Sequence, residues 1–138
     1  MPKKQLFTLV LILFLLTSCS RPNQKALDVV ASINSDTTTY LYVIADIDSF
    51  DNSYNQCANN IIDHYLKNDF SSVKFSYDNG YPNQITAYVY GSMENFKSAK
   101  QLFTIDYSPK SSANSDRYNV KENYSEYTFN ISYATKND

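Results

Sequence analysis

The stretch Tyr40–Lys67, YLYVIADIDSFDNSYNQCANNIIDHYLK, contains the two strongest structural signals in the chain. Its first part, Tyr40–Ile47, is apolar on both faces of an extended chain, which is typical of an inner strand covered on both sides. Its last part, Ser53–Lys67, has apolar side chains at helical spacing. Ser53 and Gln56 have the spacing of a capping box, which marks the beginning of a helix. The sequence therefore predicts an inner strand followed by an amphipathic helix.

Downstream of this helix, alternation of apolar and polar residues predicts a β-hairpin. Residues 73–77 alternate in this way, and Gln84–Tyr90 forms the returning strand. Between them, residues 78–83 consist almost entirely of residues that favour turns.

Three further segments complete the expected order. Ser92 caps a second, shorter helix, whose buried side includes Phe96 and Phe103. Glu126–Tyr133 alternates in polarity and forms the last strand. Lys25–Ile33 has apolar residues at helical spacing, so we expect a short helix there; its β-branched residues would also suit a first strand.

The resulting order is strand, helix, strand, strand, helix, strand. This order predicts an α+β fold in which an antiparallel sheet carries two helices on one face, with the ferredoxin-like βαββαβ topology. Another small α+β sandwich is the alternative.

The N-terminus has the features of a secretory signal. Lys3 and Lys4 precede an apolar run, Leu6–Leu16, which is too short to cross a bilayer as a helix. The run ends in Leu16-Thr17-Ser18-Cys19, which resembles the lipobox of bacterial lipoprotein precursors. The resemblance implies that the chain is cut before Cys19 and that Cys19 carries the lipid.

This resemblance divides the chain into a signal peptide (residues 1–18), a lipidated cysteine with a short tether (19–24) and one α+β domain (25–138). It places the protein at the bacterial cell envelope, anchored in a membrane through Cys19. Because Ser20 rather than Asp follows Cys19, the resemblance favours the outer membrane over the inner membrane in a cell that has both.

The composition excludes several classes of function. Two glycines cannot supply the common glycine-rich phosphate loops. One histidine and two cysteines cannot form a His-rich or Cys-based zinc site. A net charge of −2 gives no reason to expect nucleic acid as a partner. We expect no cofactor.

Two groups of residues are candidate sites. Thr86, Tyr88 and Tyr90 share the strand face opposite Ile85, Ala87 and Val89, and tyrosines on an open sheet face would suit a protein or glycan partner. The second group, at the strand-to-helix connection, offers carboxylates to a metal such as Ca²⁺ and consists of Asp46, Asp48 and Asp51.

The function expected from these features is non-catalytic binding at the envelope. The alternatives are a metal-binding or hydrolytic envelope enzyme, which would use those aspartates and His64, and an immunity or inhibitor lipoprotein. Cys57, in the apolar stripe of the predicted helix, is expected to be a core residue.

Substituting Cys19→Ala tests the lipoprotein assignment. The variant should lose incorporation of labelled fatty acid and should leave the membrane fraction, because the acyl chains supply the anchoring free energy. Membrane association equal to that of the unsubstituted chain would contradict the assignment.

Overall fold

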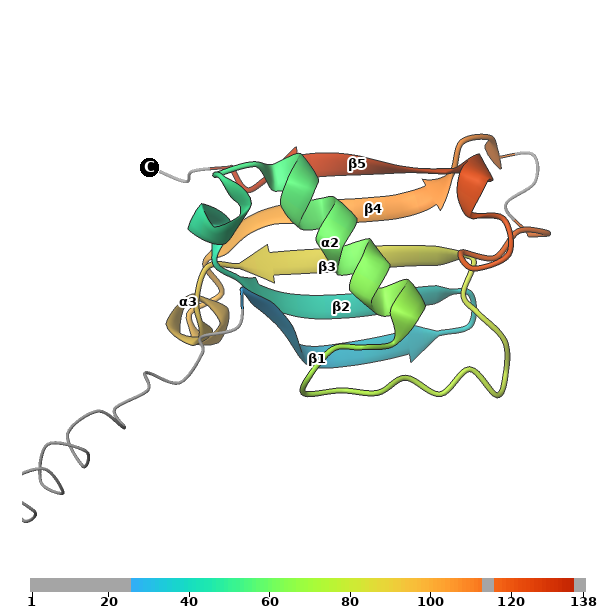
Figure 1. Cartoon of the computed structure of the whole chain (residues 1–138), viewed down its shortest axis with the longest axis horizontal. Coiled ribbons are helices and arrows are strands. Elements are labelled where there is room, and N and C mark those ends of the chain that lie inside the picture. Colours follow the sequence, from blue (N-terminus) through green and yellow to red (C-terminus); the bar gives the residue numbers. More distant parts are fainter. Residues whose placement is uncertain (1–25, 113–115, 136–138) are drawn as a thin grey trace, which may run out of the picture.

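A computed structural model describes residues 26–112 and 116–135, which are built around one five-stranded sheet (Figure 1). The strands lie side by side in chain order: β1 (Leu27–Ser35), β2 (Thr38–Ala45), β3 (Gln84–Tyr90), β4 (Gln101–Pro109) and β5 (Tyr127–Tyr133). β2 and β3 are parallel, whereas the other neighbouring strands are antiparallel. The sheet is therefore mixed, and the expected antiparallel sheet is wrong in this respect.

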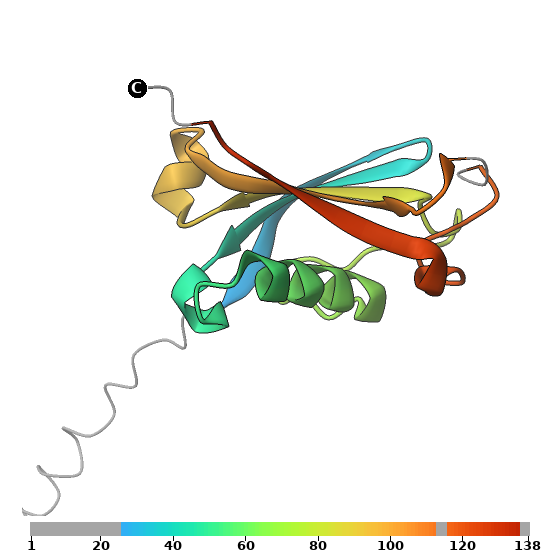
Figure 2. The same ribbon diagram turned by 90° about the horizontal axis from the view of Figure 1, so that it is seen from above.

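The helices lie on opposite faces of the sheet. α2 (Tyr54–Lys67) crosses one face diagonally, and α3 (Met93–Lys97) lies at one end of the other face (Figure 2). Two short 3-10 helices, η1 (Ile47–Phe50) and η3 (Tyr124–Glu126), precede α2 and β5. The coarse α+β class is confirmed, but the ferredoxin-like order and the placement of both helices on one face are wrong.

The core lies between α2 and the sheet. The helix contributes Cys57, Ala58 and Ile61, which are all fully buried. The sheet contributes a fully buried set: Leu41, Val43, Ala45, Ile85, Ala87, Val89, Phe103 and Ile105. As the capping pattern predicts, the Ser53 hydroxyl accepts a hydrogen bond from the Gln56 N–H at 3.2 Å. Burying each large aliphatic side chain stabilises the fold by about 1.5–3 kcal/mol, so this layer is a major source of stability.

The first segment is a strand, not the short helix that its spacing favoured. β1 pairs with β2 from Leu27 to Ser35, with a register shift between Val29 and Ala31, and Leu27 and Val29 face the core opposite Ala45 and Val43. The β-branched residues of this segment pack well on a pleated surface, and the neighbouring strand supplies the hydrogen bonds. A run this short has apolar residues that satisfy both periodicities, so its pattern alone does not decide between them.

The expected hairpin is also wrong, because residues 73–77 form no strand. They follow α2 as an extended loop that passes along the outer side of β1 (Figure 1). Their alternation is nevertheless real, since Val73, Phe75 and Tyr77 pack against the core without joining the sheet. Because residues 73–77 do not pair with it, β3 lies in an inner position between β2 and β4.

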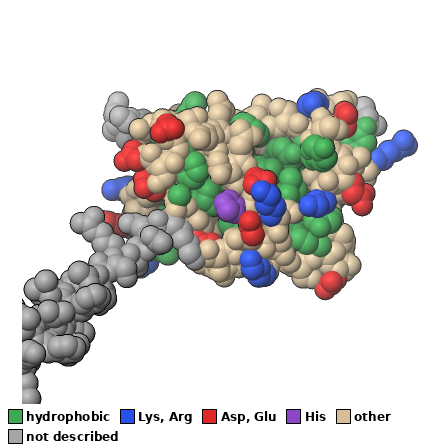
Figure 3. Space-filling model, viewed as in Figure 1, with side chains coloured by type: hydrophobic (Ala, Val, Ile, Leu, Met, Phe, Trp, Pro, Cys, Tyr) green, Lys and Arg blue, Asp and Glu red, His purple; other side chains and the backbone are tan. Residues whose placement is uncertain are grey.

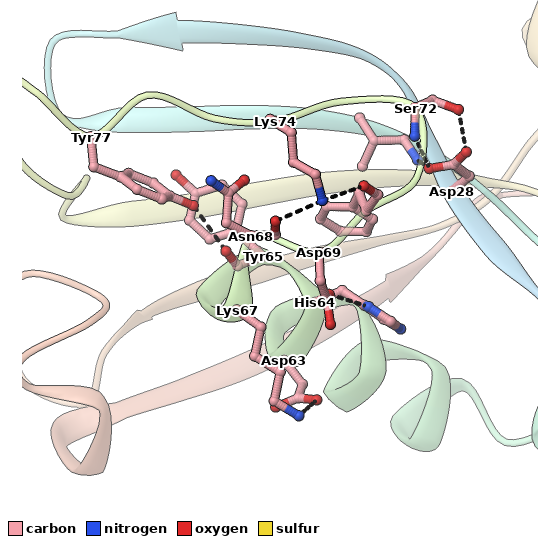
Figure 4. Close-up of polar contacts among 12 residues, drawn as sticks. Asp28, Asp63, His64, Tyr65, Lys67, Asn68, Asp69, Ser72, Lys74 and Tyr77 are labelled. Carbon is pink, nitrogen blue, oxygen red and sulfur yellow. Dashed lines mark hydrogen bonds and ion pairs between the residues drawn. The ribbon is translucent and has the colours of Figure 1, made fainter.

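Polar contacts hold this loop against the C-terminus of α2 (Figure 4). The ammonium of Lys74 donates to the carbonyls of Asn68 and Phe70, both at 3.0 Å. The Tyr77 hydroxyl donates to the Tyr65 carbonyl at 2.9 Å. These contacts supply donors to carbonyl groups in and just after the last turn of the helix.

The second helix is shorter than expected. Ser92 is its N-cap, as predicted, and accepts from the Asn95 N–H at 3.1 Å. Ala99 adopts a left-handed conformation with φ of 56° shortly after the helix ends. The chain then enters β4, so Phe103 is a core residue of that strand rather than of the helix.

β2 is an inner strand, as predicted, but it is fully covered on only one side. Leu41 and Val43 are completely buried under α2, whereas Tyr40, Tyr42 and Ile44 are half-buried on the opposite face. The prediction of cover on both sides is therefore confirmed for the α2 face and holds only in part for the second face, because α3 reaches one end of it.

Replacing Asn68 tests what ends α2. Asn68 has φ of 54°, and its amide group donates to the Phe75 carbonyl and accepts from the Phe75 N–H, at 2.9 and 2.8 Å. Asn68→Ala should lower the free energy of unfolding by about 2 kcal/mol, since it loses both bonds and strains the left-handed conformation. Asn68→Gly should lose only about 1 kcal/mol, because glycine tolerates that conformation. Urea unfolding measures both values; an equal loss in the two variants would contradict this account.

Candidate functional site

The sheet face opposite α2 carries a cluster of half-buried tyrosines. Parallel pairing aligns Tyr42 of β2 with Tyr88 of β3, and their ring centroids are 5.2 Å apart. Tyr40 lies two residues before Tyr42 on the same side of β2. We name Tyr40, Tyr42 and Tyr88 the tyrosine patch. Its neighbours include the exposed apolar side chain of Ile33, which is paired with Tyr40, and the ring of Phe96 of α3, whose centroid is 6.1 Å from that of Tyr42.

The three residues predicted as a binding platform differ in accessibility. All three lie on the face opposite the fully buried Ile85 and Val89, but only Tyr88 is half-buried there. Thr86 and Tyr90 are 6% and 8% exposed. Phe96 of α3 packs edge-on against Tyr90 with a centroid distance of 5.3 Å. Tyr90 is therefore covered by α3, and Tyr88 is the member of the predicted set that a ligand can contact.

A polar strip borders the tyrosine patch on β4 and β5. Thr104 is paired with Tyr88, and Asp106 with Thr86, whose hydroxyl donates to the Asp106 carboxylate at 2.8 Å. On β5, Ser132 and Asn130 continue these two rows. The face therefore combines apolar rings with nearby carboxylate, amide and hydroxyl groups, which is the chemistry of a surface that binds an amphipathic or hydroxyl-rich ligand.

The hydroxyl groups of Tyr88 and Tyr90 remain protonated at neutral pH. Burial raises the pKa of Tyr88, and the nearby Tyr42, Tyr40 and Asp106 raise it further. Burial also raises the pKa of Tyr90, with Tyr42 as a second cause. These tyrosines can thus donate as well as accept hydrogen bonds.

The sequence places Tyr40 and Tyr42 in the predicted inner strand Tyr40–Ile47, with nothing to join them to Tyr88. A signal was present, because Tyr40, Tyr42 and Ile44 alternate with the buried Leu41 and Val43. What the sequence pattern lacked was the parallel register of β2 and β3, which brings residues 46 positions apart, Tyr42 and Tyr88, into contact.

The three aspartates proposed as metal ligands lie around η1. Asp46 precedes η1 and accepts from the Ser49 hydroxyl at 2.9 Å, Asp48 lies within it, and Asp51 ends it with φ of 52°. Over residues 26–112 and 116–135, no three His, Cys, Asp or Glu side chains gather in a group able to hold a metal ion. This arrangement gives the metal hypothesis no support.

His64 and Cys57 occupy different environments on α2. His64 is on the surface, where its Nδ1 lies 2.5 Å from the Asp69 carboxylate (Figure 4). The hydrogen bond from His64 lowers the pKa of Asp69. Cys57 is fully buried, and burial raises the pKa of its thiol to about 12. Neither group lies in the tyrosine patch, and a thiol with so high a pKa is a poor nucleophile.

Comparisons of the chain with protein-family models, with curated proteins and with solved structures find no match. In the ranges that the structure describes, no helix is long and apolar enough to cross a membrane. Cys19, the predicted site of lipidation, lies outside the described residues.

Cys57 should react with thiol reagents only when the domain unfolds. At pH 8 the folded domain should not consume Ellman's reagent through this thiol, whereas the urea-unfolded chain should consume it rapidly, because unfolding removes the burial that raises the pKa. Reaction in the folded state at the rate of the unfolded chain would contradict the assignment of Cys57 to the core.

Proposed function

We propose that the chain is a lipid-anchored protein of the bacterial cell envelope that binds a partner, a protein or a glycan, through the tyrosine patch. The observation that carries the binding proposal is the half-exposed, in-register contact of Tyr42 with Tyr88 on the sheet face opposite α2. Tyrosine is enriched at binding surfaces, because its ring supplies a large contact area at a small cost in side-chain entropy.

The surroundings of the patch favour binding over catalysis. The nearest carboxylate, that of Asp106, accepts a hydrogen bond from the Thr86 hydroxyl and lies in a row of uncharged polar side chains. His64 is on α2, on the other side of the sheet. Nucleophilic catalysis would need a base beside the attacking group, so this face is better suited to recognition.

The lipobox at Leu16–Cys19 supports the location of the protein at the envelope. The sheet begins at Leu27, eight residues after Cys19. Even a fully extended tether of this length, at ~3.5 Å per residue, would let the domain reach only about 30 Å from its lipid. The partner should consequently be close to the same membrane, and an outer-membrane location is the preferred one in a cell with two membranes.

Tyr88→Ala is the substitution that tests the binding proposal. In the full lipidated chain it should weaken partner binding roughly tenfold, since a central aromatic contact contributes more than 1 kcal/mol. Two measurements cover the two kinds of partner: cosedimentation with purified cell-wall glycan, and photo-crosslinking to envelope proteins from a probe at the exposed Ile33, which is next to the patch.

Tyr124→Ala provides the matched control. Tyr124 is the same residue type and is 66% exposed, but it lies on η3, at the end of the sheet away from α3. It should leave both kinds of binding unchanged, and thermal unfolding verifies that both variants are folded. Equal binding by the Tyr88 and Tyr124 variants in both measurements would refute the proposed site.

A further inference from the structure

β5 is an edge strand of the sheet, and its hydrogen bonds to β4 determine which of its backbone groups point outward. The Lys110 N–H donates to the Glu126 carbonyl, and the Ala134 N–H donates to the Leu102 carbonyl. Residues 126 and 134 therefore point their peptide groups at β4, and the pairing between them contains no bulge. Because peptide groups alternate in an antiparallel strand, the odd-numbered residues 127–133 direct their N–H and C=O groups outward.

This outer edge lacks the usual protection against strand pairing. The strand YTFNISY contains no charged residue and no proline, which are the features that commonly prevent one edge from pairing with another. Its side chains toward the α2 face include the half-buried Phe129 and Ile131 and the 64% exposed Tyr133. By contrast, a loop passes along the outer side of β1, where Ser72 donates to Asp28 (Figures 1 and 4).

A hollow adjoins this edge on the α2 face. It has a volume of about 330 Å³, and Leu66, Tyr127 and Phe129 supply the apolar part of its lining. Figure 3 shows hydrophobic side chains exposed on this face beside the charged surface of α2. A strand added to β5 would extend the row formed by Phe129 and Ile131 and would cover part of this surface.

The sequence of β5 is nearly the same in both directions about Asn130. Reading outward from Asn130, Phe129 corresponds to Ile131, Thr128 to Ser132, and Tyr127 to Tyr133. In an antiparallel pair of identical strands centred on Asn130, each residue faces its counterpart in this series. Every facing pair then consists of compatible side chains, apolar or aromatic with its like and hydroxyl with hydroxyl, which favours this pairing across a two-fold axis.

We propose that a second copy of this chain binds the edge, with β5 pairing antiparallel to β5 about a two-fold axis at Asn130. The outward-pointing residues fall opposite one another in this register, Phe129 facing Ile131 of the second copy and Tyr127 facing its Tyr133. Each such pair exchanges two backbone hydrogen bonds. Asn130 faces its own copy, and the two side-chain amides can each donate to and accept from the other.

The axis of this pairing is perpendicular to the sheet, so one continuous sheet results. Both copies of α2 lie on one face, and both tyrosine patches lie on the other. The dimer does not depend on the proposed partner of the patch, but it would present two patches on one face, separated by β4 and β5 of both copies, and so raise the avidity for a repetitive ligand.

Disulfide crosslinking of the full chain in its membrane tests the register. In Asn130→Cys, the two thiols would face each other with Cα atoms about 4.5 Å apart, which a disulfide can bridge. Thr128→Cys is the matched control, because Thr128 is on the same strand face and is also exposed. Its own copy would be four residues out of register, roughly 13 Å away, which is beyond the reach of a disulfide.

After oxidation, a non-reducing gel should show several times more crosslinked dimer for Asn130→Cys than for Thr128→Cys. The double variant Thr128→Cys/Ser132→Cys should restore crosslinking, because these positions face each other across the axis. Equal crosslinking by the two single variants, or none above that of the unsubstituted chain for Asn130→Cys, would overturn the proposal.

A charge substitution provides a second measurement that does not depend on thiols. In Asn130→Lys the ammonium faces Asp106 within its own chain, which favours folding, and faces another lysine across the axis, which opposes pairing. The variant should have half the mass of the unsubstituted protein in analytical ultracentrifugation in detergent. Ser132→Lys, whose counterpart is Thr128, should remain a dimer; equal masses for all three proteins would contradict the two-fold register.

Discussion

The side chains of β2 and β3 that meet beneath α2 are all fully buried: Leu41, Val43, Ala45, Ile85, Ala87 and Val89. They reach this position because the two strands run parallel and in register, Leu41 beside Ala87 and Val43 beside Val89. A tight turn cannot join parallel neighbours, so the chain must leave the sheet after β2 and return to its other end. α2 and the loop after it form this connection, and the helix covers the buried row as it crosses. The pairing thus decides both the path of the chain and the location of the core.

The same pairing makes the two faces of the sheet different. The long helix covers one face, and among the helices in the described part of the chain only the five-residue α3 covers part of the other face. Tyr42 and Tyr88 meet there in a half-exposed contact. A tyrosine can occupy such a position at little cost, because its ring packs against its neighbours while its hydroxyl group remains in water. The proposed binding surface is therefore a consequence of how the chain connects its parallel strands.

Local pattern predicted the elements that are stabilised by their own sequence. The apolar stripe and the Ser53 cap located α2, and the alternation in Glu126–Tyr133 located β5. The local pattern failed where the neighbouring strand comes from a distant segment of the chain. Residues 73–77 alternate like a strand that would pair with β3. The position beside β3 is occupied by β2, so these residues pack as a loop. For the site, the pattern identified the face of Tyr88 correctly and missed Tyr42, whose role depends on strand register.

The amino-acid pattern was sufficient for the α+β class, for the helix Tyr54–Lys67 and for the lipobox resemblance, because periodicity, capping and a short motif are read from residues close together in the chain. Tertiary structure alone decided that β1 is a strand, that β3 lies parallel to β2 and that Tyr40 and Tyr42 join Tyr88 rather than the core. Each of these depends on a hydrogen-bonded neighbour many residues away. A strand satisfies its backbone only through such neighbours, whereas a helix satisfies its own.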